Sequence, residues 1–88
     1  MKISKTAAAG TMESSDVYVE IEPGEGVCVE LESVVAQQFG DSIRAVVREV
    51  LTQCGVENAN VRVVDRGALD CVIRARVETA VLRGKGEV

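Results

Sequence analysis

The chain has 88 residues, which allow one small domain and exclude a fold with separate catalytic and cofactor domains. Hydrophobic residues make up 47% of it, enough for a core, and histidine is absent, so neither a Ser-His-Asp triad nor a histidine-ligated metal site can exist within it. The net charge is −4, and the stretch from Glu13 to Glu32 contains no Lys or Arg, which argues against binding to nucleic acids or to an anionic membrane surface.

Three cysteines lie far apart in the sequence, at Cys28, Cys54 and Cys71. No Cys-x-x-Cys pair is present, so neither a zinc site nor a thioredoxin-type redox site is predicted. Each cysteine falls in an apolar pattern, so we expect three buried thiols in a reducing compartment. No apolar run reaches the length of a signal peptide or a membrane span, and we therefore expect a soluble cytoplasmic protein.

The first half of the chain is predicted to form strands. Residues 6–11 are small and uncharged and read as an extended segment that leads into a loop. Residues 17–22 and 27–32 then alternate apolar and polar side chains around Pro-Gly-Glu-Gly, which is typical of a β-hairpin. Pairing that keeps the apolar side chains on one face places Ile21 opposite Val27, Val19 opposite Val29 and Val17 opposite Leu31.

A helix is predicted from Val35 to Cys54, ended by Gly55. Gly40 disfavours the first turn, so Asp41 is expected to cap the stronger part of the helix. The apolar stripe expected to face the core consists of Val35, Phe39, Ile43, Val46, Val47, Val50 and Cys54.

A short strand at residues 61–63 and a second helix complete the prediction. Asp70, Arg74 and Glu78 form an i, i+4, i+8 ladder of alternating charge, which favours a helix over a strand. The expected buried side of this helix consists of Leu69, Ile73, Val77, Ala80 and Val81. The predicted fold is α+β, in the order β-β-β-α-β-α, with one antiparallel or mixed sheet and two helices on one face. The folded domain is expected to span 1–83, followed by a flexible tail at 84–88.

Two serines are candidate attachment sites. Ser14, in Glu13-Ser14-Ser15-Asp16, lies in a predicted loop outside the apolar pattern and would present its hydroxyl to another protein. Without a histidine, Ser14 is not a self-activated nucleophile, so it would be an acceptor modified by a second enzyme or an ordinary turn residue.

Ser42 is the second candidate. Gly40-Asp41-Ser42-Ile43 is similar to the Asp-Ser-Leu attachment site of ordinary acyl carrier proteins, whose serine opens a helix and carries phosphopantetheine. Those carriers are all-helical, whereas this chain begins with strands. A helix-entry serine beside the Asp41 cap explains Ser42 equally well.

Three blocks together resemble the acyl carrier (gamma) subunit family of citrate lyase: residues 10–16 (GTMESSD), 38–45 (QFGDSIRA) and 65–78 (DRGALDCVIRARVE). The resemblance covers roughly residues 1–83 and implies a non-catalytic carrier. It implies that Ser14 carries 2'-(5''-phosphoribosyl)-3'-dephospho-CoA through a phosphodiester, with Glu13 and Asp16 as motif neighbours and Ser15 as runner-up. At the place of Ser42 the family commonly has Ala.

The resemblance also implies partners. The group would carry acetyl and citryl thioesters between the citrate lyase alpha and beta subunits, after a holo-ACP synthase (the prosthetic-group transferase) attaches it and an acetylating ligase loads it. The basic residues Arg44, Arg48, Arg74 and Arg76 would mark docking sites or lie on solvated helix faces. The alternatives are a carrier subunit of malonate decarboxylase, which uses the same group, and an unmodified α+β interaction domain.

Overall fold

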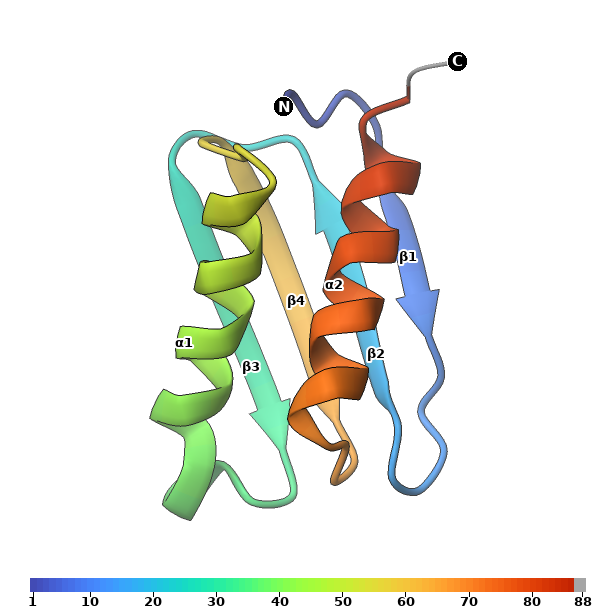
Figure 1. Ribbon diagram of the computed structural model, residues 1–88, viewed down its shortest axis with the longest axis vertical. Helices are drawn as coiled ribbons and strands as arrows, with labels where there is room; N and C mark the ends of the chain where they lie inside the picture. Colours follow the sequence, from blue (N-terminus) through green and yellow to red (C-terminus); the bar gives the residue numbers. More distant parts are fainter. Residues whose placement is uncertain (87–88) are drawn as a thin grey trace.

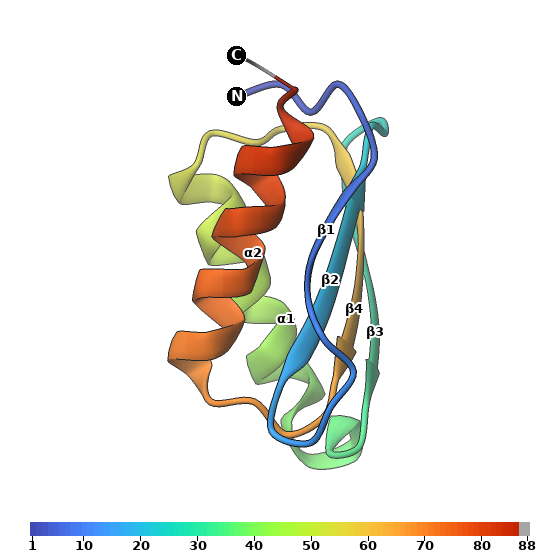
Figure 2. The same cartoon turned by 90° about the vertical axis from the view of Figure 1, so that its right-hand side faces the viewer.

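The computed structural model describes residues 1–86, and within them the elements follow the predicted order β-β-β-α-β-α. The strands are β1 (Ala7–Gly10), β2 (Val17–Glu22), β3 (Val27–Ser33) and β4 (Ala59–Asp65), and the helices are α1 (Ala36–Gln53) and α2 (Asp70–Gly84). Both helices cover the same face of a single sheet (Figures 1 and 2), which confirms the α+β prediction. Within the described residues, no helix is both long and apolar enough to cross a membrane.

The strand pairing differs from the predicted hairpin. The sheet order is β1-β2-β4-β3, so β4 lies between the two strands that were expected to pair. β2 runs antiparallel to β4, and β3 runs parallel to it, with α1 as the crossover between β3 and β4. The predicted pairs between residues 17–21 and 27–31 are therefore wrong. The assignment of the apolar residues of both strands to one face of the sheet is nevertheless correct. Val19 of β2 and Leu31 of β3 both pair with Val63 of β4, one from each side.

Charge and burial explain why β4 takes the central position. Val61 and Val63 are almost completely buried, and a strand between two neighbours satisfies its backbone hydrogen bonds on both sides. On the outer face, Arg62 pairs in register with Glu20 of β2 and with Glu30 of β3. A basic residue between two acidic ones favours this order.

The core lies between the helices and the inner face of the sheet. The four residues Ile73, Val77, Ala80 and Val81 are buried as predicted for α2. Leu69 is 71% exposed, contrary to prediction, because it precedes the helix in an extended conformation. Gly84 ends α2 against the sheet, where a Cβ would lie 3.0 Å from Cγ2 of Ile21, so a small residue permits the close approach.

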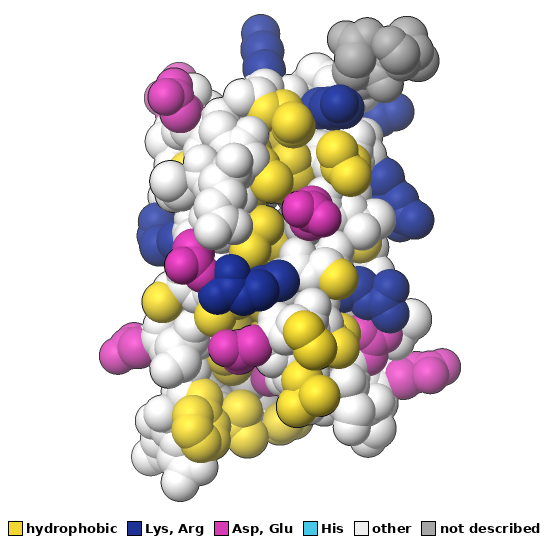
Figure 3. Space-filling view, in the orientation of Figure 1, with side chains coloured by type: hydrophobic (Ala, Val, Ile, Leu, Met, Phe, Trp, Pro, Cys, Tyr) yellow, Lys and Arg dark blue, Asp and Glu magenta, His cyan; other side chains and the backbone are white. Residues whose placement is uncertain are grey.

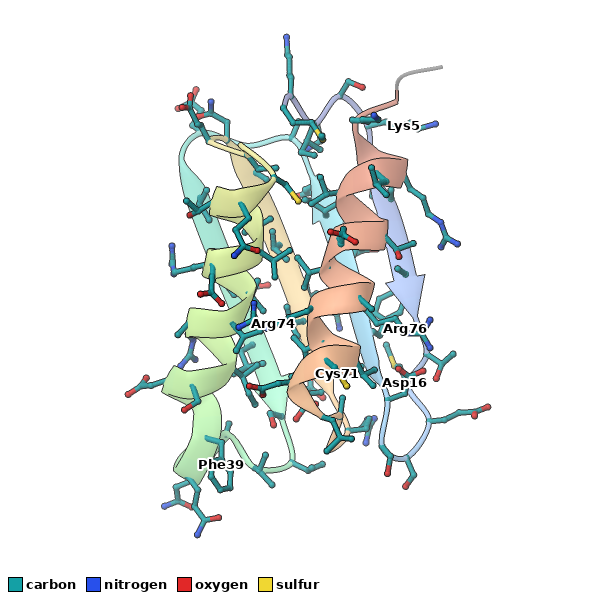
Figure 4. All side chains as sticks on the ribbon, viewed as in Figure 1. Lys5, Asp16, Phe39, Cys71, Arg74 and Arg76 are labelled. Atoms are coloured by element: carbon teal, nitrogen blue, oxygen red, sulfur yellow. The ribbon has the colours of Figure 1, made fainter. Side chains whose placement is uncertain are left out.

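The first turn of α1 also differs from prediction. The helix begins at Ala36 and continues through Gly40, so Asp41 does not cap it; the Asp41 carboxylate instead lies 3.7 Å from Arg44. Phe39 was expected in the core but is 52% exposed. The first turn of α1 extends beyond the end of β3 (Figure 1), and Phe39 lies there (Figure 4), where the sheet offers no surface for its ring to cover.

The cysteines are less buried than expected. Cys28 and Cys71 are exposed and Cys54 is half-buried, so the prediction of three buried thiols is wrong. Cys28 alternates with the inward-facing residues of β3, and Cys71 lies in the first turn of α2. The strand period therefore places Cys28 on the outer face with Glu30, and the expectation failed because the apolar character of Cys was weighted above its position.

The charge ladder of α2 predicted a helix correctly, but its central residue binds elsewhere. Arg74 forms an ion pair with Glu49 of α1, which links the two helices. The C-terminal boundary stays a prediction: α2 runs to Gly84, one residue beyond the expected domain end at 83, and positions 87–88 of the expected tail lie outside the described residues.

Candidate functional site

Three connections meet at one end of the molecule, the lower end in Figure 1. They are the β1–β2 loop (residues 11–16), the β3–α1 connection and the β4–α2 connection (residues 66–69). Ser14 and Ser15 lie in the β1–β2 loop, and both are exposed. The strands therefore place the predicted attachment motif at the edge of the fold, away from the core.

The Glu13–Asp16 segment forms a hydrogen-bonded turn. The Asp16 amide donates to the Glu13 carbonyl at 3.1 Å, which makes Ser14 and Ser15 the two central residues. Ser15 has φ 65, and a positive φ at the second central position is typical of a type II turn. The Ser15 amide also donates to the Arg66 carbonyl at 2.9 Å. Ser15 thus holds the turn through its backbone, while the Ser14 side chain has no hydrogen-bond partner among the described residues.

The Asp16 carboxylate organises the rest of the loop. It accepts hydrogen bonds from the Thr11 hydroxyl at 2.6 Å and from the Val17 amide at 2.7 Å. The Thr11 oxygen in turn accepts from the Glu13 amide at 3.2 Å. The side chains of Thr11 and Asp16, at the two ends of the loop, therefore bond to each other and to nearby backbone amides, as expected for Thr and Asp in turns.

Arg76 of α2 reaches the same carboxylate (Figure 4). Its Nε and Nη2 lie 3.1 and 3.0 Å from the two oxygens of Asp16, which is the bidentate geometry that guanidinium groups favour. The hydrogen bonds from Thr11, Arg76 and the Val17 amide hold the pKa of Asp16 at about 2, below the ordinary value of 3.8. Asp16 is therefore ionised at neutral pH.

Gly10 makes room for this arrangement. It has φ 93, and a Cβ at this position would lie 1.9 Å from the Val17 carbonyl oxygen and 3.2 Å from Cδ of Arg76. A side chain at residue 10 would push apart the strand ends and the arginine that crosses them. The glycine at the start of the motif is thus a structural requirement of the loop.

A buried carboxylate braces the neighbouring connections. Asp65, at the end of β4, is 1% exposed and accepts a hydrogen bond from the Ser33 hydroxyl at 2.8 Å. It also accepts from the backbone amides of Gly67 and Ala68 at 3.2 and 3.0 Å. Because Arg66 follows it directly and pairs with the serine turn, Asp65 helps to fix the surface against which the turn rests.

The structure does not bring the two candidate serines together. Ser42 is exposed on α1, which packs over the β3 edge of the sheet, opposite to the β1 edge (Figure 1). It belongs to the second turn of a helix that begins at Ala36, so it is not the helix-opening residue that the similarity to other carriers requires.

Sequence reasoning missed the role of Arg76. It was interpreted as a docking or solvent-facing residue, yet it binds the motif aspartate 60 positions earlier. No local pattern signals such a contact, because it depends on the packing of α2 beside β1 and β2. Thr11 is part of the motif at residues 10–16, and its position five residues before Asp16 is compatible with the hydrogen bond that the two side chains form across the loop.

The same end of the molecule exposes hydrophobic side chains. Met12, Val34, Phe39 and Leu69 belong to its three connections and adjoining turns, and each is at least 47% exposed. Figure 3 shows hydrophobic atoms gathered at the lower end of the helix-bearing face. Within residues 1–86, no group of three potential His, Cys, Asp or Glu ligands could hold a metal ion.

A solved structure shares this fold. The chain matches one chain from a Pseudomonas malonate decarboxylase hetero-tetramer in complex with malonate, with a TM-score of 0.75 and 19% identity. The match covers 94% of this chain and 91% of the other. At this identity the likeness establishes the fold.

Sequence comparisons establish the family. A family model described as "ACP: Malonate decarboxylase delta subunit (MdcD)" matches residues 4–84. The citrate lyase acyl carrier protein of Haemophilus influenzae (strain PittEE) is 54% identical over 99% of this chain and 92% of its own length. Citrate lyase acyl carrier protein 2 of Salmonella typhimurium is 58% identical over 94% of this chain and 88% of its own. Because this identity extends along nearly the whole chain, the chain belongs to the family of citrate lyase acyl carrier proteins.

Proposed function

We propose that this chain is the acyl carrier subunit of a citrate lyase and that Ser14 holds its prosthetic group. The observation that carries the proposal is the exposed hydroxyl of Ser14 in a turn fixed on both sides by hydrogen bonds, in a chain of this family. A carrier needs no catalytic cleft of its own, because reactive chemistry belongs to the attached group and to partner enzymes.

The residues at Ser14 fit such an attachment. The side chain is exposed and has no hydrogen bond to give up among the described residues, so a bulky substituent can extend into solvent. Attachment of phosphoribosyl-dephospho-CoA would form a bond from the Ser14 oxygen to phosphorus and break a phosphoanhydride bond in the activated donor, whose outer phosphate portion leaves into solution. The hydroxyl proton would go to a base on the transferase, because no side chain among the described residues accepts a hydrogen bond from the Ser14 hydroxyl.

When bound, the group would supply a flexible arm and a thiol on which acetyl and citryl units travel as thioesters. The contribution of this chain is to fix one end of the arm. A short flexible tether keeps its far end at roughly millimolar effective concentration near each partner site. We propose the citrate lyase alpha and beta subunits as those partners, with the holo-ACP synthase and the acetylating ligase acting before them.

We also propose that the carrier works in the cytoplasm. Its cysteines are free in the structure, and two of them are exposed, which suits a reducing compartment better than an oxidising one.

Intact mass spectrometry tests the attachment site. The chain should be purified from its native host grown on citrate, where a mass increase of coenzyme-A-derived size is expected. Ser14→Ala should remove the adduct, while the matched variants Ser15→Ala and Ser42→Ala should keep it. An adduct that persists in Ser14→Ala would refute the proposed site, and an unmodified wild-type chain would favour an interaction domain without a prosthetic group.

Malonate decarboxylase provides the second candidate function, because the family model and the solved structure both carry its name. The 54–58% identical relatives named for citrate lyase favour the first reading. The modified chain should therefore restore citrate cleavage to citrate lyase alpha and beta subunits, and it should not restore decarboxylation to malonate decarboxylase lacking its own carrier.

A further inference from the structure

We infer that Arg76 is a positioning residue for the modification of Ser14: it clamps the β1–β2 loop to α2 in the conformation that the transferase binds. The inference rests on the proposed function, because it assumes that Ser14 is the acceptor. It adds a residue from the far end of the sequence to the site, with a role that neither the motif nor the helix pattern assigns.

The clamp is specific in its geometry. Arg76 offers Nε and Nη2 to the two separate oxygens of Asp16, so the carboxylate plane is fixed as well as its position. The Asp16 side chain is 15% exposed and that of Arg76 is 40% exposed, which places the pair at the border of the fold. Asp16 directly follows the two serines, so fixing its carboxylate fixes the exit of the serine turn.

The helix gives Arg76 a rigid base. Its neighbour in sequence, Val77, is fully buried, and Ile73, one turn earlier, is 1% exposed, so the backbone of α2 is held by the core at this point. The Arg76 stem then crosses Gly10, where the missing side chain leaves it space. Gly10, Arg76 and Asp16 form one continuous path from α2 to the serine turn.

Loss of the clamp should leave the fold intact and loosen the turn. The backbone bonds between the turn and Arg66 would remain, but the carboxylate of Asp16 would keep only its own-loop partners. When a loop adopts the binding conformation for only a fraction of the time, its apparent dissociation constant for the partner equals the intrinsic constant divided by that fraction. The effect should therefore appear in the affinity for the transferase and spare the chemical step.

Modification kinetics test this inference. Purified transferase and the phosphoanhydride-activated prosthetic group are mixed with each apo carrier, and the adduct is followed by intact mass spectrometry. Arg76→Gln should raise the KM for the carrier about tenfold with kcat unchanged, as for a competent fraction of about one tenth. Arg74→Gln is the matched control, because it lies on the same helix and pairs with Glu49 instead of the loop. It should behave as wild type.

Two further readouts separate positioning from general stability. Hydrogen exchange of the Ser15 amide should accelerate in Arg76→Gln while amides in the centres of α2 and β4 keep wild-type rates. Arg76→Lys retains the positive charge but cannot donate to both carboxylate oxygens as a guanidinium does, so its KM should fall between those of wild type and Arg76→Gln. Faster exchange of core amides in Arg76→Gln would mean that this variant has lost general stability. Arg76→Lys then provides the test, and a wild-type KM in that variant would overturn the inference.

The failure of the inference and that of the proposed function look different. An unmodified wild-type chain refutes the proposed carrier function, and an adduct at a residue other than Ser14 refutes the proposed attachment site. An adduct that forms at Ser14 with the same KM in Arg76→Gln and wild type refutes the clamp alone. A lower kcat with unchanged KM would also overturn the positioning role, because it would place Arg76 in the chemical step.

Discussion

Ser14 and Ser15 are adjacent and equally polar, yet the turn assigns them different tasks. Ser15 adopts a positive φ and donates its amide to Arg66, so the backbone at this position sets the turn. Ser14 precedes it and keeps its hydroxyl exposed and without a partner among the described residues. The sequence motif alone left both serines as candidates, because turn position depends on dihedral angles that residue types do not determine.

This division predicts that Ser15→Gly is tolerated. Glycine adopts a positive φ without the steric cost that other residues pay, but it gains freedom in the unfolded chain. The free energy of unfolding should therefore change by less than about 1 kcal/mol in either direction. Urea denaturation measures it, and Ser15→Val is the contrasting variant, which should be less stable than wild type. A large loss of stability in Ser15→Gly would contradict the assigned role.

Asp16 should make stability depend on pH at acidic values. Its folded pKa of about 2 lies below the ordinary 3.8, so the ionised carboxylate stabilises the fold above pH 3.8, and this contribution is lost as the pH falls through about 2. Screening at the partly exposed Arg76 limits the contribution to about 1 kcal/mol. The difference in unfolding free energy between wild type and Asp16→Asn should therefore shrink from about pH 4 to about pH 2. A constant difference over this range would contradict the shift.

Asp65 should matter more for stability than any exposed acid. Asp65→Ala would leave the Ser33 hydroxyl and the amides of Gly67 and Ala68 without their acceptor in a buried position. Lost hydrogen bonds to a charged group predict a loss of about 3 kcal/mol in the free energy of unfolding. Asp70→Ala, an exposed acid close in sequence, is the control and should change it by less than about 1 kcal/mol. Equal effects of the two variants would refute the bracing role.

At the scale of whole elements, the sequence predicted types and faces better than neighbours. Alternation identified β2 and β3 and placed their apolar residues on one face, and helical spacing located both helices. Alternation could not identify β4 as the strand between β2 and β3, because a strand shows the same alternation whichever strand it pairs with. The short predicted strand at residues 61–63 also gave little sign of a central position. Phe39 was misplaced because helical periodicity continues past the point where the sheet ends, and Leu69 because it lies one residue before the helix begins.

The strand order predicts a specific effect of Arg62→Glu. This change places three acids in register across β2, β4 and β3, because Arg62 lies between Glu20 and Glu30. Like charges in directly opposed positions should lower the free energy of unfolding by about 1–2 kcal/mol, and added salt should reduce the loss. Arg62→Gln should lose less. A loss for Arg62→Glu that does not respond to salt would contradict the electrostatic explanation of the order.

At the scale of the whole molecule, the fold separates the candidate attachment site from the segment before β1 and the end of α2. Residues 11–16 and 66–69 meet at one end, while the segment before β1 and the end of α2 meet at the other (Figure 1). The contact between these two loops joins residues about 50 positions apart, and Arg76 adds a third segment. The sequence showed residues 10–16 and 65–78 as separate blocks but gave no sign that they meet, because sheet order and helix packing bring them together.

This separation predicts a local response to modification. Attachment at Ser14 should change amide chemical shifts in residues 11–16 and in residues 66–70, because the Ser15 and Arg66 backbones are hydrogen-bonded to each other's loops. Amides at the other end, such as those of Ser4 and Lys5 bonded to the Gly84 carbonyl, should keep their shifts. Two-dimensional NMR of the apo and modified chain measures both sets. Large shifts around Gly84 would mean that the arm folds back along α2 instead of extending from the loop.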